Sequence, residues 1–305
     1  ATGDLSYGGM GAKAAAAFSQ EPLVLMAGSA MVLAGLGFKL SVVPFHMWTP
    51  DVYQGAPTPV TGFLATVSKG AVFVALTRFY LDGQLYQYDS LIMALSVVAM
   101  ASMLVGNWLA LRQDNIKRLL AYSSIAHFGY LLIVLIAMAA AQSTMSSELI
   151  GQAITFYLAA YIMTTLAAFT VIANLAGEDD SKSMLSAFEG LFWRNPVQAS
   201  ALTVAMLSFA GIPLTAGFIG KFYLIMLSIQ SQLWVLLGAL VLGSAIAIYY
   251  YLRIIFAMSK TSGTMIKTES RAALGAQDIV AALLLLLVLV LGSWPQPFIE
   301  FAGAL

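Results

Sequence analysis

Eight apolar stretches, each long enough to cross a lipid bilayer, dominate the sequence of this chain. An α-helix needs about 20 predominantly apolar residues to cross the hydrocarbon core of a membrane. The stretches are apolar on all faces, which excludes the alternating strands of a transmembrane barrel. The sequence therefore predicts an all-α, polytopic transmembrane helix bundle. Its spans are expected approximately at residues 23–46, 59–81, 90–111, 116–140, 149–175, 197–228, 233–257 and 276–294.

The composition agrees with a membrane protein and excludes several kinds of site. Charged residues make up only 9% of the 305 residues, whereas soluble domains contain about 25%. The formal net charge of zero gives no electrostatic basis for binding nucleic acid. Cysteine is absent and the two histidines stand far apart, so we expect no metal site. No GxGxxG or P-loop motif opens a helix, so we expect no redox cofactor within this chain.

The amino-terminal residues differ in character from the rest of the chain. Residues 1–22 are rich in Gly and Ala, and they lack the basic segment and apolar core of a signal peptide. We expect them to form an extracytoplasmic loop. Because the first residue is Ala1 rather than Met, we also expect that the amino-terminal part of a longer protein is missing.

The basic residues predict how the bundle is oriented. With eight spans, both ends of the chain lie on the same side of the membrane. The loops of that side, counted with the adjacent span ends, hold only two basic residues, Lys13 and Arg78. The positive-inside rule therefore predicts that Ala1 and Leu305 face the periplasm. The opposite side holds nine basic residues, namely Arg112, Lys117, Arg118, Lys182, Arg194, Arg253, Lys260, Lys267 and Arg271.

Two of the spans contain residues that interrupt a helix. The first span carries Pro44 five residues after Lys39, and the sixth contains the segment AGIPLTAG over residues 210–217. Proline removes a backbone donor, and glycine weakens a helix further. Interrupted helices at membrane depth are typical of transporter sites, where protein or water satisfies the freed backbone groups. We therefore expect a broken helix at each of these two places.

Three lysines lie inside apolar spans, and we interpret them as functional. Placing a charge at the centre of a membrane helix costs at least ~2.5–3.5 kcal/mol. Desolvation disfavours the charged form of a lysine side chain, so a buried amine can accept and release a proton near neutral pH. The alternative is that each side chain reaches the headgroups by snorkelling. This alternative suits Lys69 least, because it lies about ten residues from either end of its span, roughly 15 Å. The three residues are Lys39, Lys69 and Lys221.

The two histidines admit two interpretations each. His127 lies eleven residues into the fourth span beside Ser and Tyr side chains, and it is either a proton relay or a hydrogen-bonded core residue. His46 lies at a span end near Trp48, and it is either structural or a point of proton entry. Asp51 is expected to serve a cap or turn among neighbouring prolines. Hydroxyls that either line a proton path or join helices are those of Thr66, Ser68, Tyr249, Tyr250 and Tyr251.

Three motifs give the chain a resemblance to a known family. Residues 38–69 read FKLSVVPFHMWTPDVYQGAPTPVTGFLATVSK, residues 114–130 read DNIKRLLAYSSIAHFGY, and residues 207–224 read LSFAGIPLTAGFIGKFYL. These segments closely resemble subunit N of the bacterial proton-translocating NADH–quinone oxidoreductases, also called respiratory complex I. The stretch TPDVYQGAP is typical of subunit N, whereas other antiporter-like subunits read closer to LPDAH…AP. The superfamily also includes the Mrp-type cation/proton antiporters.

The resemblance implies a fold of fourteen helices with two inverted five-helix repeats, of which this chain would be the carboxy-terminal portion. It implies that Lys39 belongs to the first half-channel, Lys69 to the central connection and Lys221 to the second half-channel, with His127 between the last two. The glutamate that pairs with the first lysine in the family lies on an earlier helix, which is absent here. The chain would then divide into an extracytoplasmic loop (1–22), two helices of the first repeat (23–81), the second repeat (82–257), and a loop with a terminal helix (258–305).

The resulting hypothesis is a proton-translocating membrane subunit that couples quinone reduction to proton transport in the respiratory chain. By the resemblance, FMN, iron–sulfur clusters and ubiquinone would be held by partner subunits, and adjacent antiporter-like subunits would flank this chain in the bacterial inner membrane. Two alternatives remain open. One is an Mrp-type antiporter subunit that exchanges Na⁺ or K⁺ for H⁺ without NADH. The other is a non-conducting scaffold, which predicts that neutralising the lysines leaves pumping unchanged.

Overall fold

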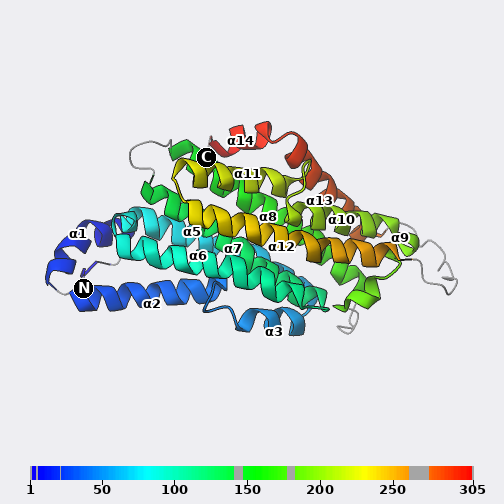
Figure 1. Ribbon diagram of the computed structural model, residues 1–305, viewed down its shortest axis with the longest axis horizontal. Helices are drawn as coiled ribbons and strands as arrows, with labels where there is room; N and C mark the ends of the chain where they lie inside the picture. Colours follow the sequence, from blue (N-terminus) through cyan, green and yellow to red (C-terminus); the bar gives the residue numbers. More distant parts are fainter. Residues whose placement is uncertain are drawn as a thin grey trace.

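The computed structural model describes residues 2–4, 6–20, 22–140, 147–176, 183–260 and 275–303. Within these residues the chain is helical throughout, with no strand longer than a single bridge between Asn115 and Met184. The helices run roughly along the long axis of the molecule (Figure 1). Their bounds are α1 Tyr7–Gln20, α2 Pro22–Leu40, α3 Trp48–Gly55, α4 Thr58–Phe63, α5 Lys69–Asp82, α6 Asp89–Leu111, α7 Ile116–Ala140, α8 Ser147–Ala176, α9 Leu191–Arg194, α10 Pro196–Ala210, α11 Ala216–Gln230, α12 Trp234–Ser259, α13 Ala276–Ser293 and α14 Gln296–Gly303.

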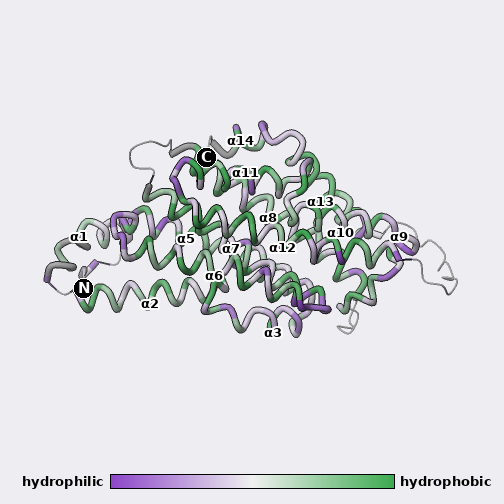
Figure 2. The backbone as a smooth tube through the Cα atoms, in the orientation of Figure 1, coloured by the Kyte–Doolittle hydropathy of each residue, from purple (hydrophilic) through white to green (hydrophobic). Residues whose placement is uncertain are grey.

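The predicted all-α membrane bundle is confirmed. Seven helical segments among the described residues are long and apolar enough to cross a membrane. The shorter helices α10 and α11 are also apolar, and together they occupy the sixth predicted span, 197–228. Hydrophobic residues fill most of the helix length, and hydrophilic residues gather mainly near the turns (Figure 2).

Helix α7 lies at the centre of the bundle. In its most apolar window 94% of the residues are buried, against 11% in α2 and 17% in α13. Glycines allow α6 to approach α7 closely, because a Cβ at Gly106 would lie 2.9 Å from the backbone of Tyr122 and Ala126. Small residues at such interfaces are typical of membrane helices. Side chains on α7 are therefore held away from lipid on every face.

Both predicted helix interruptions are present, and they end in the same way. Helix α2 ends just before Ser41 (φ 63°), and α10 ends just before Gly211 (φ 82°). In each case the next N–H turns back to a carbonyl five residues earlier, from Val42 to Gly37 and from Ile212 to Leu207, both at 3.0 Å. This is the Schellman termination, which satisfies carbonyls that the broken helix frees. The first predicted span, 23–46, is accordingly shorter as a helix than expected.

The loop expected over residues 1–22 is wrong, because Tyr7–Gln20 forms helix α1. The four consecutive alanines at 14–17 are strong helix formers and outweigh the three glycines in the segment. At the other end, Gln296–Gly303 forms the additional short helix α14. Most of the loop expected after residue 258 lies outside the described residues.

The turns that carry most of the basic residues meet at one end of the bundle. Leu185 N–H donates to the Asp114 carbonyl at 2.8 Å, and Gly190 N–H donates to the Ala257 carbonyl at 3.4 Å. The two marked chain ends lie in the opposite half of the molecule (Figure 1). Because these turns meet at one end of the bundle, their basic residues lie on one side of the molecule. This supports the count of basic residues from which the orientation is predicted. The orientation itself stays a prediction.

Candidate functional site

A one-turn π-helix, Leu64–Ser68, stands directly before Lys69 at the start of α5. Within it the Thr66 hydroxyl donates to the Gly62 carbonyl at 2.6 Å, so Thr66 serves its own helix. Such local widening of a helix is frequent at functional sites, since it redirects the following side chains. The sequence did not predict this feature.

Lys69 is buried in the middle of the bundle, with 1% of its surface exposed. Its Nζ donates a hydrogen bond to the Ser124 hydroxyl at 2.8 Å. The same amine lies 5.3 Å from the ring centre of Tyr53 and 5.4 Å from that of Phe128. Aromatic faces stabilise a cation, whereas a hydroxyl partner accepts a hydrogen bond from a charged or a neutral amine. The environment is therefore compatible with both protonation states.

Ser124 connects Lys69 to the next helix. The Tyr161 hydroxyl of α8 donates to the same Ser124 oxygen at 2.9 Å. The Tyr161 ring packs against the His127 ring at 5.4 Å between centres. Three helices, α5, α7 and α8, thus contribute to one polar cluster that begins at Lys69.

His127 is buried, and tyrosine hydroxyls lie near both of its ring nitrogens. Nδ1 is 2.7 Å from the Tyr157 hydroxyl, and Nε2 is 3.4 Å from the Tyr251 hydroxyl. The Tyr251 hydroxyl also forms a short hydrogen bond with Ser123. A neutral imidazole needs a donor on one side and an acceptor on the other, and tyrosine can serve as either. The pair of hydroxyls can therefore stabilise either tautomer of His127.

A small space between side chains lies beside His127. It has a volume of about 10 Å³ and is lined by side chains from α7, α8 and α10 and by the start of α11. The side chains of Tyr157, Tyr161, Thr164 and Ser208 border it together with His127, but the wall that faces the space is mainly apolar. An ordered water needs several polar partners, so we assign none to this space.

Lys221 lies on α11 and reaches back to the interruption that precedes it. Its Nζ donates to the Ala210 carbonyl at 3.0 Å, one of the carbonyls freed where α10 ends. Only 7% of the Lys221 surface is exposed. Its aliphatic stem lies against Gly211, where an added Cβ would be 2.8 Å from Cδ. The broken helix thus supplies both the acceptor and the space for its own lysine.

Tyr130 stands between the lysine and the histidine. The Lys221 Nζ is 5.6 Å from the centre of the Tyr130 ring, and the His127 ring packs edge-on against it, also at 5.6 Å. The Tyr130 hydroxyl accepts from the Asn107 amide at 2.8 Å, and Tyr250 donates to the Asn107 carbonyl at 2.9 Å. Asn107 and Tyr250 therefore fix the ring that separates the two titratable groups.

Of the four predicted relay residues, the structure brings three together. Lys69, His127 and Lys221 surround one buried cluster of hydroxyls. Lys39 lies in the last turn of α2 with its side chain exposed. Among the described residues no hydrogen bond or ring contact joins Lys39 to the cluster.

The other polar candidates divide between the cluster and the surface. Tyr250 and Tyr251 belong to the cluster, whereas Tyr249 is 65% exposed and Ser68 is half-buried. His46 is buried away from the cluster, and its Nδ1 forms no hydrogen bond. Asp51 lies in the first turn of α3 and forms an ion pair with Arg118 at 2.5 Å.

The sequence did not predict Tyr157 and Tyr161 as members of the cluster, and it predicted Ser124 as a neighbour of His127 rather than as the partner of Lys69. The spacing of these residues along the sequence indicates a shared polar helix face. Ser124 and His127 are three residues apart, and Tyr157 and Tyr161 are four apart, which places each pair on one helix face. Polar residues repeated at this spacing within an apolar span indicate a polar face inside a bundle.

The site has the chemistry of proton exchange between neutral and cationic groups. It offers two amines, one imidazole and a series of hydroxyls, with no carboxylate among the described residues in contact with Lys69 or Lys221. The described residues also contain no group of three or more His, Cys, Asp or Glu side chains able to hold a metal ion. Proton transfer and electrostatic coupling are what this arrangement can perform.

The chain is similar to known proteins over most of its length. Residues 3–247 match the family described as NADH:quinone oxidoreductase/Mrp antiporter, transmembrane. The chain is 47% identical over 301 residues to NADH-quinone oxidoreductase subunit N of Methylococcus capsulatus, covering 99% of this chain and 59% of that relative. The chain thus spans about three fifths of the length of the curated relative it matches.

Solved structures show the same fold. A chain of respiratory complex I from Thermus thermophilus with bound aureothin is 36% identical, with a TM-score of 0.73 over 89% of this chain and 57% of its own length. A chain of the Mrp complex from a Dietzia species gives a TM-score of 0.82 at 21% identity, over 99% of this chain and 62% of its own length. The second likeness concerns the fold alone.

Proposed function

The chain belongs to the NADH:quinone oxidoreductase/Mrp antiporter family of transmembrane proteins, and on that premise we propose that it is a proton-translocating membrane subunit of an NADH–quinone oxidoreductase. One observation carries the proposal most directly. Lys69 is buried at the centre of the membrane bundle and is hydrogen-bonded to a hydroxyl that leads towards His127 and Lys221. A buried amine without a carboxylate partner has little structural value and a high cost, which favours a functional role.

In this proposal, Lys69 and Lys221 each exchange a proton, and the cluster between them transmits the change. Protonation of Lys69 alters the field at Ser124 and Tyr161, and their hydroxyls reorient. His127 responds through the hydroxyls of Tyr157 and Tyr251, since both of its tautomers are compatible with these neighbours. Charge interactions are strong in this region because burial lowers the local dielectric constant.

Lys39 has a different place in the proposal. Its side chain is exposed on the surface of this chain, in the last turn of the first broken helix. We assign it to the first half-channel, where the family resemblance supplies a glutamate from an earlier helix. The full proton path therefore requires more than the residues of this chain.

The redox chemistry is assigned to other subunits. FMN, iron–sulfur clusters and quinone would be held by partners, and this chain would bind none of them. The adjacent antiporter-like subunits are the expected neighbours in the bacterial inner membrane, with both ends of this chain on the periplasmic side. The identity to subunit N of Methylococcus capsulatus supports this placement.

The decisive experiment measures NADH-driven proton translocation in membrane vesicles carrying Lys69→Ala in the full-length protein. Assembly of the complex and quinone reduction are measured on the same sample. Pumping should fall, alone or together with quinone reduction if the two are tightly coupled. Lys69→Arg should also fail, because an arginine keeps the charge but does not release its proton. The exposed Lys13→Ala is the matched control, and full pumping by Lys69→Ala at wild-type turnover would contradict the proposal.

The chain shares its fold with a chain of the Mrp complex, so the alternative function as an antiporter subunit also needs a test. A stand-alone antiporter subunit exchanges Na⁺ or K⁺ for H⁺ when no NADH is supplied. The same vesicles, energised by a pH gradient alone, distinguish the two functions. Ion exchange that persists without NADH and depends on Lys69 would favour the antiporter.

A further inference from the structure

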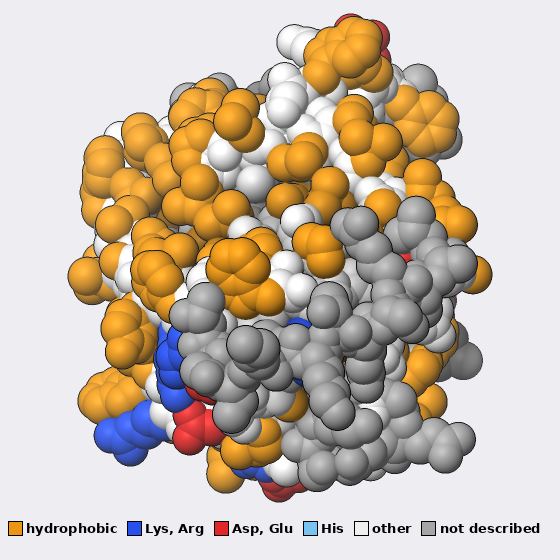
Figure 3. All heavy atoms as spheres, turned by 90° about the vertical axis from the view of Figure 1, so that its right-hand side faces the viewer, with side chains coloured by type: hydrophobic (Ala, Val, Ile, Leu, Met, Phe, Trp, Pro, Cys, Tyr) orange, Lys and Arg blue, Asp and Glu red, His pale blue; other side chains and the backbone are white. Residues whose placement is uncertain are grey.

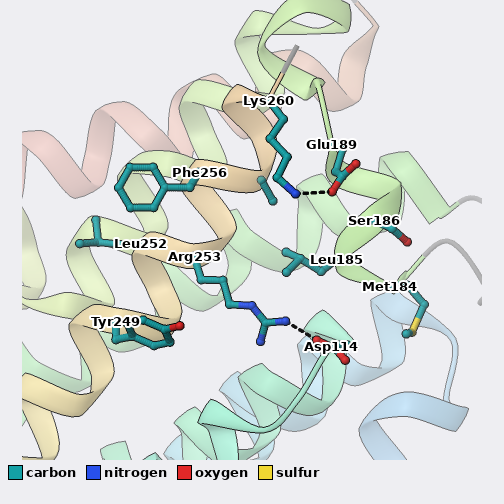
Figure 4. Close-up of a pocket in the computed structure, with 11 residues that line it drawn as sticks. Asp114, Met184, Leu185, Ser186, Glu189, Tyr249, Leu252, Arg253, Phe256 and Lys260 are labelled. Atoms are coloured by element: carbon teal, nitrogen blue, oxygen red, sulfur yellow. Dashed lines mark hydrogen bonds and ion pairs between the residues drawn. The ribbon is translucent and has the colours of Figure 1, made fainter. Parts of the chain in front are cut away.

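A second polar region lies at the end of the bundle, away from the buried cluster. It is a cavity of about 580 Å³ between the carboxy-terminal part of α12 and the turns that follow α6 and α8 (Figure 4). None of its lining residues belongs to the cluster around Lys69, His127 and Lys221. The proton path therefore leaves this cavity unexplained.

The cavity is lined by two cations and two carboxylates. Arg253 pairs with Asp114, and Lys260 pairs with Glu189 at 2.8 Å (Figure 4). Arg253 lies in the last two turns of α12, and Lys260 directly follows the end of that helix at Ser259. All four groups are partly exposed. They offer two positive and two negative positions to a ligand, with no net charge.

The wall of the cavity along α12 is apolar and aromatic. Tyr249 and Phe256 line it and are 65% and 67% exposed. Figure 3 views this end of the molecule and shows basic and acidic side chains beside one another, bordered by hydrophobic side chains. Because α12 is a candidate membrane span over Trp234–Ser259, its charged end is expected at the membrane surface. The cavity thus has one charged and one apolar side at the depth of the lipid headgroups.

From this arrangement we propose that the cavity binds a zwitterionic phospholipid with a primary ammonium group, of the phosphatidylethanolamine class. Its phosphate lies between Arg253 and Lys260. Its ammonium donates charge-assisted hydrogen bonds to Asp114 and Glu189. Its acyl chains follow the apolar side of α12 past Phe256 and Tyr249.

The charge pattern decides among the lipid classes. An anionic headgroup would draw the two cations away from Asp114 and Glu189 and would leave both carboxylates without a positive partner. A choline headgroup carries a positive charge but has no N–H group to donate to them. Only a headgroup with both a phosphate and a primary ammonium matches all four side chains. The inference requires only that α12 spans a membrane, and it does not depend on proton transport.

The test uses the full-length protein in its complex, reconstituted into vesicles of phosphatidylcholine, phosphatidylglycerol and phosphatidylethanolamine in equal parts. A trace of phosphatidylethanolamine carries a diazirine on the acyl chain near the glycerol. After illumination, mass spectrometry should find label on the α12 segment from Tyr249 to Phe256. Unlabelled phosphatidylethanolamine should compete better than the other two lipids. Labelling of Leu286, an exposed residue of α13, reports the general lipid contact of a folded protein.

Two pairs of substitutions test the two halves of the site. Arg253→Gln with Lys260→Gln should lower labelling of α12 by about tenfold, while Leu286 stays unchanged. Asp114→Asn with Glu189→Gln should reverse the competition, so that phosphatidylglycerol competes better than phosphatidylethanolamine. Arg112→Gln, an exposed cation at the same end that does not line the cavity, should change nothing.

Three results overturn the proposal. Equal competition by all three lipids shows an apolar contact without headgroup recognition. Competition by inorganic phosphate alone shows an anion site that requires no lipid. Absence of label on α12, with normal label on Leu286, shows that no phospholipid enters the cavity.

Discussion

Lys69 and Ser124, on neighbouring helices, are joined by a hydrogen bond of 2.8 Å from Nζ to Oγ. Tyr161 donates to the same oxygen at 2.9 Å, so both acceptor positions of the hydroxyl are occupied. In the proposed proton exchange, Ser124 is the hydroxyl that contacts the Lys69 amine directly.

Replacing Ser124 tests that relationship. Ser124→Ala removes the acceptor of Lys69 and of Tyr161 at once, and NADH-driven proton translocation should fall by about tenfold. Initial rates of vesicle acidification, normalised to assembled complex, measure the effect. Ser228→Ala is the control, because Ser228 is buried too but donates only to a carbonyl of its own helix. Equal pumping by the two variants would remove Ser124 from the path.

The second prediction concerns the interruption beside Lys221. Gly211 has a φ of 82°, which disfavours any residue with a Cβ, and an alanine there would press on the Lys221 stem. Gly211→Ala should lower the free energy of unfolding by about 1–2 kcal/mol and should also reduce pumping. Thermal unfolding of the purified complex measures the first effect.

Gly238→Ala provides the matched comparison for that substitution. Gly238 lies in α12, and a Cβ there would meet no atom within 4 Å. This change should leave stability unchanged or raise it slightly, since alanine favours a helix. A similar loss in both variants would show that the effect at 211 is not due to backbone conformation.

The third prediction concerns a lysine that sequence reasoning placed with the surface cations. Lys117 is fully buried at the start of α7, and its Nζ donates to the Ala56 carbonyl at 2.8 Å, in the turn between α3 and α4. Lys117→Met keeps most of the side-chain volume but leaves that carbonyl without this donor. It should lower the free energy of unfolding by about 1–3 kcal/mol.

The readout for Lys117 separates anchoring from proton transfer. Because the turn it holds leads into the helix of Lys69, pumping and assembly should decline together in Lys117→Met. Pumping per assembled complex should stay close to that of the wild type. Specific loss of pumping in fully assembled complex would instead make Lys117 part of the proton path.

The sequence predicts the helices well and the site in part. Apolar length alone locates the eight spans, because every backbone group in lipid must be paired within a helix. It also selects Lys69 and Lys221, since a charge inside an apolar span is conspicuous. The helical character of residues 7–20 was missed, because glycines in a Gly- and Ala-rich segment suggested a loop.

The partners of the lysines could not be predicted, for a physical reason. Ser124, Tyr157 and Tyr161 are ordinary residues of membrane helices, where hydroxyls commonly join neighbouring helices. Only the packing of α8 against α7 turns them towards one another. The π-helix before Lys69 likewise depends on tertiary contacts, and nothing in the segment LATVS distinguishes it from a regular helix.

The last prediction concerns the two hydroxyls near His127. Tyr157→Phe removes the partner of Nδ1, which lies at 2.7 Å, whereas Tyr251→Phe removes the more distant partner of Nε2 at 3.4 Å. Both changes keep the ring and its packing.

If His127 relays protons, Tyr157→Phe should reduce pumping more than Tyr251→Phe, because the shorter contact is the stronger hydrogen bond. Vesicle acidification and quinone reduction on the same samples measure the order, and Tyr249→Phe, at the exposed neighbour, is the control. Wild-type pumping by both variants would indicate that His127 is a packed core residue.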